Sequence, residues 1–224
     1  MVVSMMIDLH THTLFSDGEL IPSELVRRAK VTGYQAIALT DHVDFTNLDI
    51  TLAGAKAARY LEEGFDIKVL AGVEITHVPP KLIPKLARQA KASGAEIVVV
   101  HGETPVEPVA PLTNLAAVEC EYVDILAHPG FITEEEAKLA ADNGVCLEIT
   151  ARYGHNVTNG HVARTAREAG AKLVVDTDTH APENLITRER ALAVARGAGL
   201  SENEAEEVLG NSKDLLSKIL KNRV

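Results

Sequence analysis

Short apolar runs alternate with helix-like stretches along most of the chain. Seven of these runs predict buried strands, because they are short, aliphatic and bounded by turn residues. They are Met5–Ile7, Ala36–Leu39, Ile67–Leu70, Ile97–Val100, Val123–Leu126, Val145–Ile149 and Lys172–Val175. Apolar residues at helical spacing predict helices at residues 22–32, 53–62, 80–93, 112–121, 133–143, 159–169, 188–196 and 201–222, two of which open with capping boxes, Thr133 with Glu136 and Ser201 with Glu204. The alternation is typical of parallel strands joined by right-handed crossovers in an α/β protein.

Polar residues follow the carboxyl ends of the predicted strands. They are His10 and His12, His42, Glu74, His101, His128, and Asp178 with His180. An open sheet would spread such residues along one edge, whereas a closed barrel brings all strand ends to one mouth. The pattern therefore favours a barrel-like closure over an open doubly wound sheet.

Metal ligation is the interpretation that best explains these residues. In an extended strand, residues two apart point to the same side, so His10 and His12 can present both imidazoles to one cation. Imidazole suits zinc, iron and manganese. A single histidine after a strand is more often structural, but six of the nine histidines lie at such places, together with Glu74, Asp178 and Asp17. The set as a whole predicts a metal site.

Composition narrows the class of protein. A chain of 224 residues with 46% hydrophobic and 24% charged residues is typical of a single globular domain over residues 1–224. The apolar stretches are too short to span a bilayer and the start lacks a secretory signal, so we expect a cytoplasmic protein with no membrane partner. Cys120 and Cys146 are expected to be buried free thiols. The net charge of −10 disfavours nucleic acid as a partner. The oligomeric state is left open.

The polar motifs at the ends of the predicted strands resemble those of the polymerase and histidinol phosphatase (PHP) domain family of metal-dependent phosphoesterases. The matching motifs run from residue 8 to residue 180, and helices over about 188–222 follow them. They are His10-Thr-His12 with Ser16-Asp17-Gly18, Thr40-Asp41-His42, Gly72-Val-Glu74, His101, His128-Pro-Gly130 and Asp178-Thr-His180. The resemblance implies a distorted (β/α)7 TIM-like barrel and a trinuclear site for three divalent metals, which are zinc, manganese or iron.

The resemblance also implies a set of ligands for each of the three metals. The first would be held by His10, His12, Glu74 and Asp178, the second by bridging Glu74 with His101 and His128, and the third by His42, His180 and Asp17. Asp8, Asp41 and Asp176 have no ligand role in this scheme and are expected to be supporting or structural acids that orient histidines.

Such a site predicts hydrolysis of a small phosphomonoester, either histidinol phosphate or a nucleotide-like phosphate. Two metals that share a carboxylate lower the pKa of a water between them from about 15.7 towards 7, which creates a hydroxide nucleophile at neutral pH. Asp17 and His42 are candidate general acids. Arg152, suited to bidentate phosphate contact, and His155 are candidate substrate-binding residues. The proline-rich segment 104–111 is either a semi-rigid lid or a spacer.

Three alternatives stay open. Amidohydrolase-type metal hydrolases also place two histidines after the first barrel strand, although here Glu74 takes the bridging place of their modified lysine. PHP domains also act as nuclease or accessory modules of DNA polymerases, and a related fold occurs in a ribonuclease P subunit. The third alternative is a metalloprotein without catalytic activity.

Overall fold

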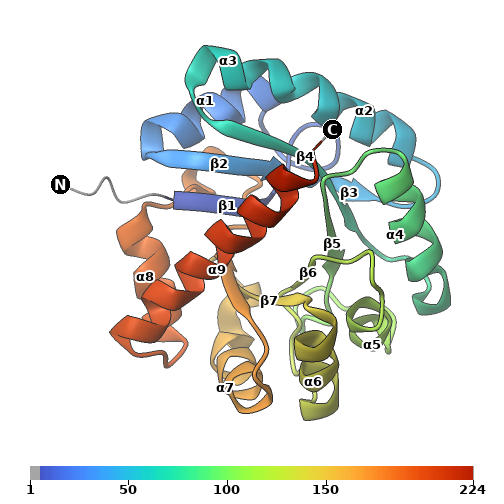
Figure 1. Ribbon diagram of the computed structural model, residues 1–224, viewed down its shortest axis with the longest axis vertical. Coiled ribbons are helices and arrows are strands. Elements are labelled where there is room, and N and C mark those ends of the chain that lie inside the picture. The colour runs from blue at the N-terminus through green and yellow to red at the C-terminus, as the bar shows by residue number, and fades with distance from the viewer. Residues whose placement is uncertain (1–5, 224) are drawn as a thin grey trace.

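The computed structural model describes residues 6–223. The protein has an α/β fold, in which one parallel β-sheet is surrounded by helices (Figure 1). Met5, which the sequence analysis placed in the first strand, lies outside the described residues. The sheet order is β1-β2-β4-β5-β6-β7-β8, with β3 paired to β4 beside this path. The strands are β1 (Met6–Thr11), β2 (Tyr34–Leu39), β3 (His42–Val43), β4 (Lys68–Ile75), β5 (Ile97–His101), β6 (Ile125–Ala127), β7 (Cys146–Thr150) and β8 (Leu173–Asp176).

Helices follow the strands along the chain and cover the outside of the sheet (Figure 1). They are α1 (Pro22–Thr32), α2 (Leu48–Ala57), α3 (Leu61–Phe65), α4 (Ile83–Ala92), α5 (Thr113–Val118), α6 (Glu134–Asn143), α7 (Asn159–Ala169), α8 (Arg188–Gly197) and α9 (Glu202–Lys221). Four 3-10 turns are η1 (Ala58–Tyr60), η2 (Pro80–Leu82), η3 (His155–Thr158) and η4 (Pro182–Asn184). Both predicted capping boxes are confirmed.

The predicted helix at 53–62 was wrong in its bounds. The helix α2 already begins at Leu48, because Leu48 and Leu52 extend its buried face towards the amino terminus. It is then interrupted by η1 before α3 begins. The predicted helix at 112–121 is likewise shorter, as α5 ends at Val118.

The sheet closes into a distorted barrel between β1 and β8. The closing contact is a single bridge between Thr11 and Thr179. Two buried carboxylates supply further hydrogen bonds across this seam. Asp176 accepts the Leu9 N–H at 2.7 Å, and Asp8 accepts the Thr177 N–H at 3.1 Å and its hydroxyl at 2.6 Å. Asp8 and Asp176 thus join the two strands as structural acids; within the described residues neither is hydrogen-bonded to a histidine ring, although Asp8 also accepts the backbone N–H of His10 at 3.4 Å.

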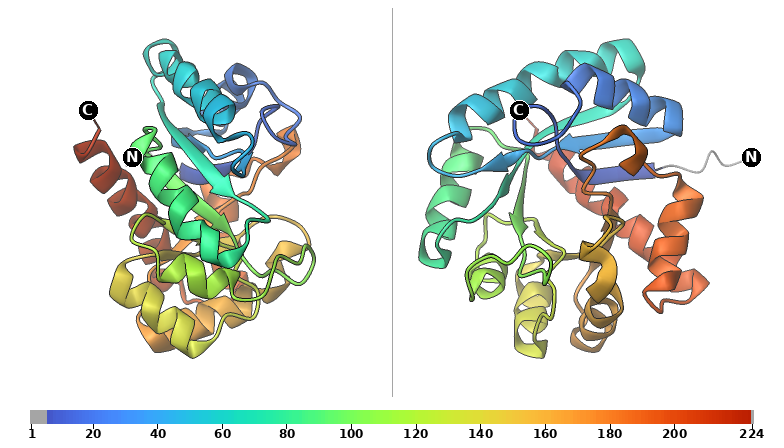
Figure 2. Two further views of the ribbon diagram at one scale, coloured as in Figure 1. Left: turned by 90° about the vertical axis from the view of Figure 1, so that its right-hand side faces the viewer. Right: turned by 180° about the vertical axis from the view of Figure 1, so that it is seen from behind.

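Apolar side chains fill the inside of the barrel and are covered at one end by α9. The interior positions come from strands around the barrel, among them Ile7, Leu9, Leu70, Val99, Ile125 and Val174. Leu215, Leu216 and Ile219 of α9 pack against them. Figure 2 (left) shows α9 on one side, with the strands running away from it. The C-terminal helix therefore covers the base of the barrel and leaves the opposite end, the mouth, to polar residues.

Two further expectations concern cysteines and membranes. Cys120 and Cys146 are free and buried, as predicted. Within residues 6–223, no helix combines the length and the apolar character needed to cross a bilayer.

Candidate metal centre

The carboxyl ends of the strands bring all nine predicted ligands together at the mouth. Their nitrogen and oxygen atoms form four groups in which all members lie within 4.8 Å of one another. The groups are His10, His12 and Glu74; His10, His128 and Asp178; His12, Asp17, His42 and His180; and His101, His128 and His155. Each predicted ligand belongs to at least one group. His155, predicted as a substrate contact, joins them.

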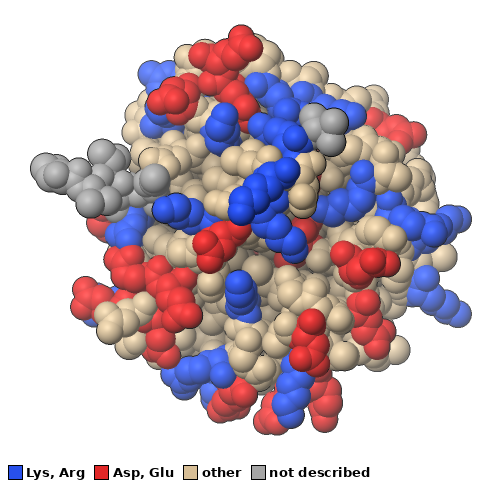
Figure 3. Space-filling view, in the orientation of Figure 1, with Lys and Arg blue, Asp and Glu red and all other residues tan. Residues whose placement is uncertain are grey.

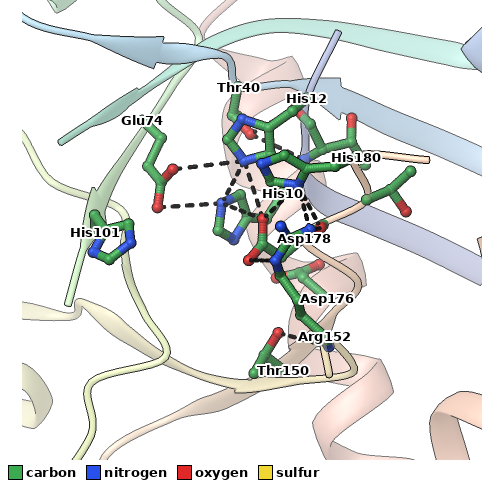
Figure 4. A network of polar contacts seen from close by, with 12 residues as sticks. His10, His12, Thr40, Glu74, His101, Thr150, Arg152, Asp176, Asp178 and His180 are labelled. Carbon is green, nitrogen blue, oxygen red and sulfur yellow. Dashed lines mark hydrogen bonds and ion pairs between the residues drawn. The ribbon is translucent and has the colours of Figure 1, made fainter. Parts of the chain in front are cut away.

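His10, His12, Glu74 and Asp178 surround one small space at the centre of the mouth (Figure 4). The Nε2 atoms of His10 and His12 are 3.1 Å apart. Glu74 Oε1 is 3.3 Å from His10 Nε2, and Asp178 Oδ1 is 3.2 Å from His12 Nε2. Ligand atoms about 2.1 Å from a tetrahedral ion are separated by about 3.4 Å, so these separations fit donors around one cation.

Glu74 is the residue whose surroundings fit a bound cation most clearly. Both of its carboxylate oxygens are buried, and within the described chain neither has a hydrogen-bond partner. Oε2 is 2.7 Å from His42 Nδ1, but this contact lacks hydrogen-bond geometry, and the same nitrogen lies 2.7 Å from the Thr76 hydroxyl. Burying a charge without such partners is costly unless a counter-charge or metal accompanies it. The residues present therefore fit a divalent metal ion.

Burial and neighbouring charges together control the protonation of the predicted ligands. Burial lowers the pKa values of His10 and His42, but the charge of Glu74 outweighs it, so that the pKa of His10 lies well above the usual range and that of His42 is about 9. Burial and the neighbouring His42 hold the pKa of His12 well below the usual range. Burial and the neighbouring His101 do the same for His128. Both rings are therefore neutral at neutral pH, which is the form that binds metals. Burial raises the pKa of Asp178 to about 7. A cation bound here must displace the proton from Asp178, so metal binding and proton release are coupled.

Asp17, His42 and His180 gather with His12 at the outer side of the mouth. Asp17 Oδ1 is 3.1 Å from His180 Nε2 and 3.5 Å from His42 Nε2. The loop that carries Asp17 is fixed by Asp41, which accepts the Thr13 N–H and the Ser16 hydroxyl, each at 2.7 Å. Asp41 thus holds the backbone of this loop, rather than a histidine ring as expected.

Glu148 is a residue of the site that the sequence analysis missed. It points inwards from β7 and is fully buried. Its Oε1 is 3.1 Å from the ring nitrogen Nδ1 of His10, and its Oε2 accepts a hydrogen bond from the backbone N–H of His128 at 2.8 Å. Such carboxylate–imidazole contacts fix the orientation of a metal-binding ring. An acidic residue inside an otherwise apolar strand, Cys-Leu-Glu-Ile-Thr, was the available signal.

Two ligand positions have unusual backbone conformations. His128 has a φ of 28° and Asp178 a φ of 50°, both in the left-handed region that disfavours side chains. Such strain costs about 1–3 kcal/mol per residue and persists where the surrounding structure enforces it, commonly at functional sites. Gly130 follows His128 closely, and a Cβ added there would lie 2.0 Å from the Glu103 carbonyl oxygen. The loop after β6 therefore needs glycine at position 130, where it packs against the Glu103 backbone.

The two predicted substrate contacts lie at the edge of the centre. Arg152 donates to the Asp178 carbonyl at 3.0 Å, and its Nε is 3.4 Å from Asp178 Oδ2. His155 packs against His128, with ring centroids 4.4 Å apart. Glu107 of the proline-rich segment has Oε2 at 3.7 Å from His101 Nε2 and 3.8 Å from His155 Nε2. The segment 104–111 thus contacts the mouth.

Comparison with known proteins identifies the family. The model of the PHP domain matches residues 8–164. The chain belongs to the PHP domain family. An uncharacterized protein of Methanocaldococcus jannaschii is 55% identical to this PHP chain over 221 residues, covering 96% of this chain and 100% of that protein. Ribonuclease P protein component 3 of Methanosarcina mazei is 30% identical over 208 residues, covering 86% and 81%.

Further relatives of this PHP protein differ in their described activities. A Thermoanaerobacter protein described as a probable phosphatase is 26% identical over 230 residues, covering 90% of this chain and 89% of that protein. A chain in a structure of archaeal ribonuclease P with mature tRNA has a TM-score of 0.71 at 19% identity, covering 97% and 91%, which shows a shared fold. The ribonuclease P relatives are at odds with the expectation that nucleic acid is not a partner. That expectation rested on net charge, which averages over the whole surface.

Proposed function

We propose that this PHP protein is a metal-dependent phosphatase that hydrolyses a small phosphomonoester, such as histidinol phosphate or a nucleotide-like phosphate. The observation that carries the proposal is the buried carboxylate of Glu74, which has no hydrogen-bond partner within residues 6–223 and is surrounded by His10, His12 and Asp178. Three divalent ions, of zinc, manganese or iron, would lower the pKa of a water nucleophile and neutralise the phosphate oxygens.

The chain's own residues have distinct roles in this proposal. Glu148 holds the His10 ring in place, and Arg152 lies against Asp178, where its guanidinium adds positive charge for a phosphate. Of the two candidate acids, His42 is the one to which we assign protonation of the leaving group, because Glu74 outweighs burial and raises its pKa to about 9, whereas Asp17, whose Oδ1 lies 3.5 Å from His42 Nε2, has a pKa of about 2 and is charged. The apolar base covered by α9 leaves the mouth as the entry for substrate.

The test is to measure metal content and phosphate release on the same metal-free and reconstituted samples. We expect reconstituted protein to hydrolyse at least one phosphomonoester in a panel that also contains a phosphodiester and an amide substrate. Glu74→Gln and His128→Ala should lose hydrolysis and bound metal. His161→Ala is the matched control, because His161 is hydrogen-bonded to the Ile132 carbonyl, away from the donor groups. Hydrolysis of the amide alone would favour an amidohydrolase, and unchanged activity in both variants would overturn the proposal.

A second candidate function is the binding of RNA at the base of the barrel. A groove of about 620 Å³ lies beside the end of α9, and its lining includes five basic side chains against three acidic ones. The basic residues are Lys56, Arg59, Lys91, Lys218 and Arg223. Figure 3 shows Lys and Arg side chains gathered on the face that α9 crosses. This local excess of positive charge on an acidic chain, together with the ribonuclease P relatives, favours a polyanionic partner.

Salt dependence separates this candidate from the phosphatase. Fluorescence anisotropy with a labelled precursor tRNA should show binding that weakens steeply as salt rises. The charge reversals Lys56→Glu and Lys218→Glu should weaken it at least about tenfold and leave metal content unchanged. Binding that is absent at low salt, or that survives both substitutions, would rule out this groove as the RNA site.

A further inference from the structure

His155 is a buried imidazole that the family resemblance does not include among the metal ligands. It begins η3, and the residue is 6% exposed. Its ring centroid lies 4.4 Å from that of His128 and 6.0 Å from that of His101. Donor atoms of these three rings lie within 4.8 Å of one another. Three imidazoles from three separate segments thus meet at one place in the mouth.

Within residues 6–223, the ring of His155 makes no hydrogen bond. Nδ1 of His155 is buried and has no partner among the described residues. Nε2 is 3.8 Å from Glu107 Oε2, which is beyond hydrogen-bond distance. His128 likewise has a buried Nδ1 with no partner in residues 6–223. An unsatisfied buried polar group costs about 1–3 kcal/mol, so two neighbouring rings in this state indicate a ligand that supplies the missing interaction.

The chemistry of the group suits a metal ion. Three imidazoles with an open position are an arrangement found at catalytic zinc sites. The other three donor groups of the described chain each include Glu74, Asp178 or Asp17, whereas this group consists of imidazoles alone. His155 would add a third imidazole, which carries no negative charge, to the ion that the resemblance assigns to Glu74, His101 and His128.

We propose that His155 is a metal ligand and completes, with His101 and His128, a three-imidazole site beside the Glu74 centre. The inference rests on the proposed metal centre and gives His155 a role different from the substrate contact predicted from the sequence. Glu107 of the segment 104–111 lies next to this site, with Oε2 at 3.7 Å from His101 Nε2.

The experiment titrates the metal-free full-length protein with Co²⁺ and follows both the number of bound ions and the visible absorption of the bound cobalt. His155→Gln keeps a polar side chain of similar size, and His155→Ala guards against a fortuitous ligand from glutamine. Both variants should lose one bound ion, or bind it at least about tenfold more weakly, with a changed spectrum. His77→Ala is the matched control, because His77 also faces Glu107, at 3.7 Å, but its side chain is 58% exposed and belongs to none of the donor groups. It should behave as the wild type.

The outcomes separate this inference from the proposed function. If both His155 variants bind the wild-type number of ions with unchanged affinity and spectrum, the inference is overturned, even if KM for a phosphomonoester rises. In that case the metal centre and the phosphatase proposal stand, because the wild type still binds metal and hydrolyses substrate. If the wild type binds no metal, both fail together. Circular dichroism of the metal-free variants checks that each is folded.

Discussion

At its base the barrel is closed by Leu215, Leu216 and Ile219 of α9, whereas at its mouth the same strands end in histidines and acids. The base is complete without any ligand, because its side chains bury apolar surface against one another. The mouth keeps buried polar atoms, such as both oxygens of Glu74, that lack hydrogen-bond partners within the described chain. Substitutions at the base should therefore reduce stability, and substitutions at the mouth should reduce metal binding and activity.

The largest effect is expected for Glu74→Gln at the mouth. Loss of this charge removes the shared carboxylate, and hydrolysis should fall by at least about 10²–10³-fold. Although burial opposes its ionisation, His10 at 3.3 Å and His42 at 2.7 Å hold the pKa of Glu74 well below the usual range, so the variant loses these ion pairs and the metal-free protein should also be less stable. Steady-state kinetics and urea unfolding measure the two quantities. A Glu74→Gln variant that is less stable yet fully active would contradict the claim that residues at the mouth serve metal binding and activity.

A complementary effect is expected for Leu216→Ala at the base. The substitution leaves a cavity between α9 and the barrel interior, and the free energy of unfolding should fall by about 2–5 kcal/mol. Metal content per folded molecule should not change, because Leu216 contacts the end of the barrel opposite the ligands. Chemical unfolding followed by metal analysis of the native fraction tests both statements. Loss of metal from the native fraction would show that the two ends are not independent.

The seam between β1 and β8 sharpens the comparison, because its two carboxylates are buried but hydrogen-bonded. Burial raises the pKa of Asp8 to about 6, so at pH 7 it is charged and accepts two hydrogen bonds from Thr177. Burial and the charge of Asp8 hold the pKa of Asp176 well above the usual range, so Asp176 is protonated and, like an amide side chain, uncharged. Asp8→Asn should cost about 1–3 kcal/mol of unfolding free energy, and Asp176→Asn less than about 1. Equal or reversed costs in urea unfolding would contradict these charge states.

The smallest effect concerns pH. Burial raises the pKa of Asp178 to about 7, and the metal needs the deprotonated carboxylate. For this one proton, the affinity for metal should therefore fall by about tenfold per pH unit below pH 7. Titration calorimetry in two buffers with different ionisation enthalpies counts the protons released. Zero proton release at pH 6 would contradict the assignment.

The sequence predicted the barrel and its mouth better than the details that support them. Strand ends could be predicted because aliphatic runs such as Ile97–Val100 stop at a polar residue, and parallel strands bring these ends together. Glu148 could not be assigned, because its partners, His10 and the His128 backbone, lie far away in the sequence. The seam roles of Asp8 and Asp176 depend on closure between the first and last strands, which local patterns do not encode. The total charge likewise concealed the basic groove beside α9.

The most direct test of the account is anomalous X-ray diffraction from crystals of the full-length protein grown with Mn²⁺. We predict anomalous peaks at the mouth, within bonding distance of His10, His12, Glu74 and Asp178, and further peaks beside the groups that contain Asp17 and His101. Crystals with saturating Mn²⁺ that show an ordered mouth without such peaks, or ions bound only elsewhere on the surface, would contradict the claim that this mouth is a metal centre.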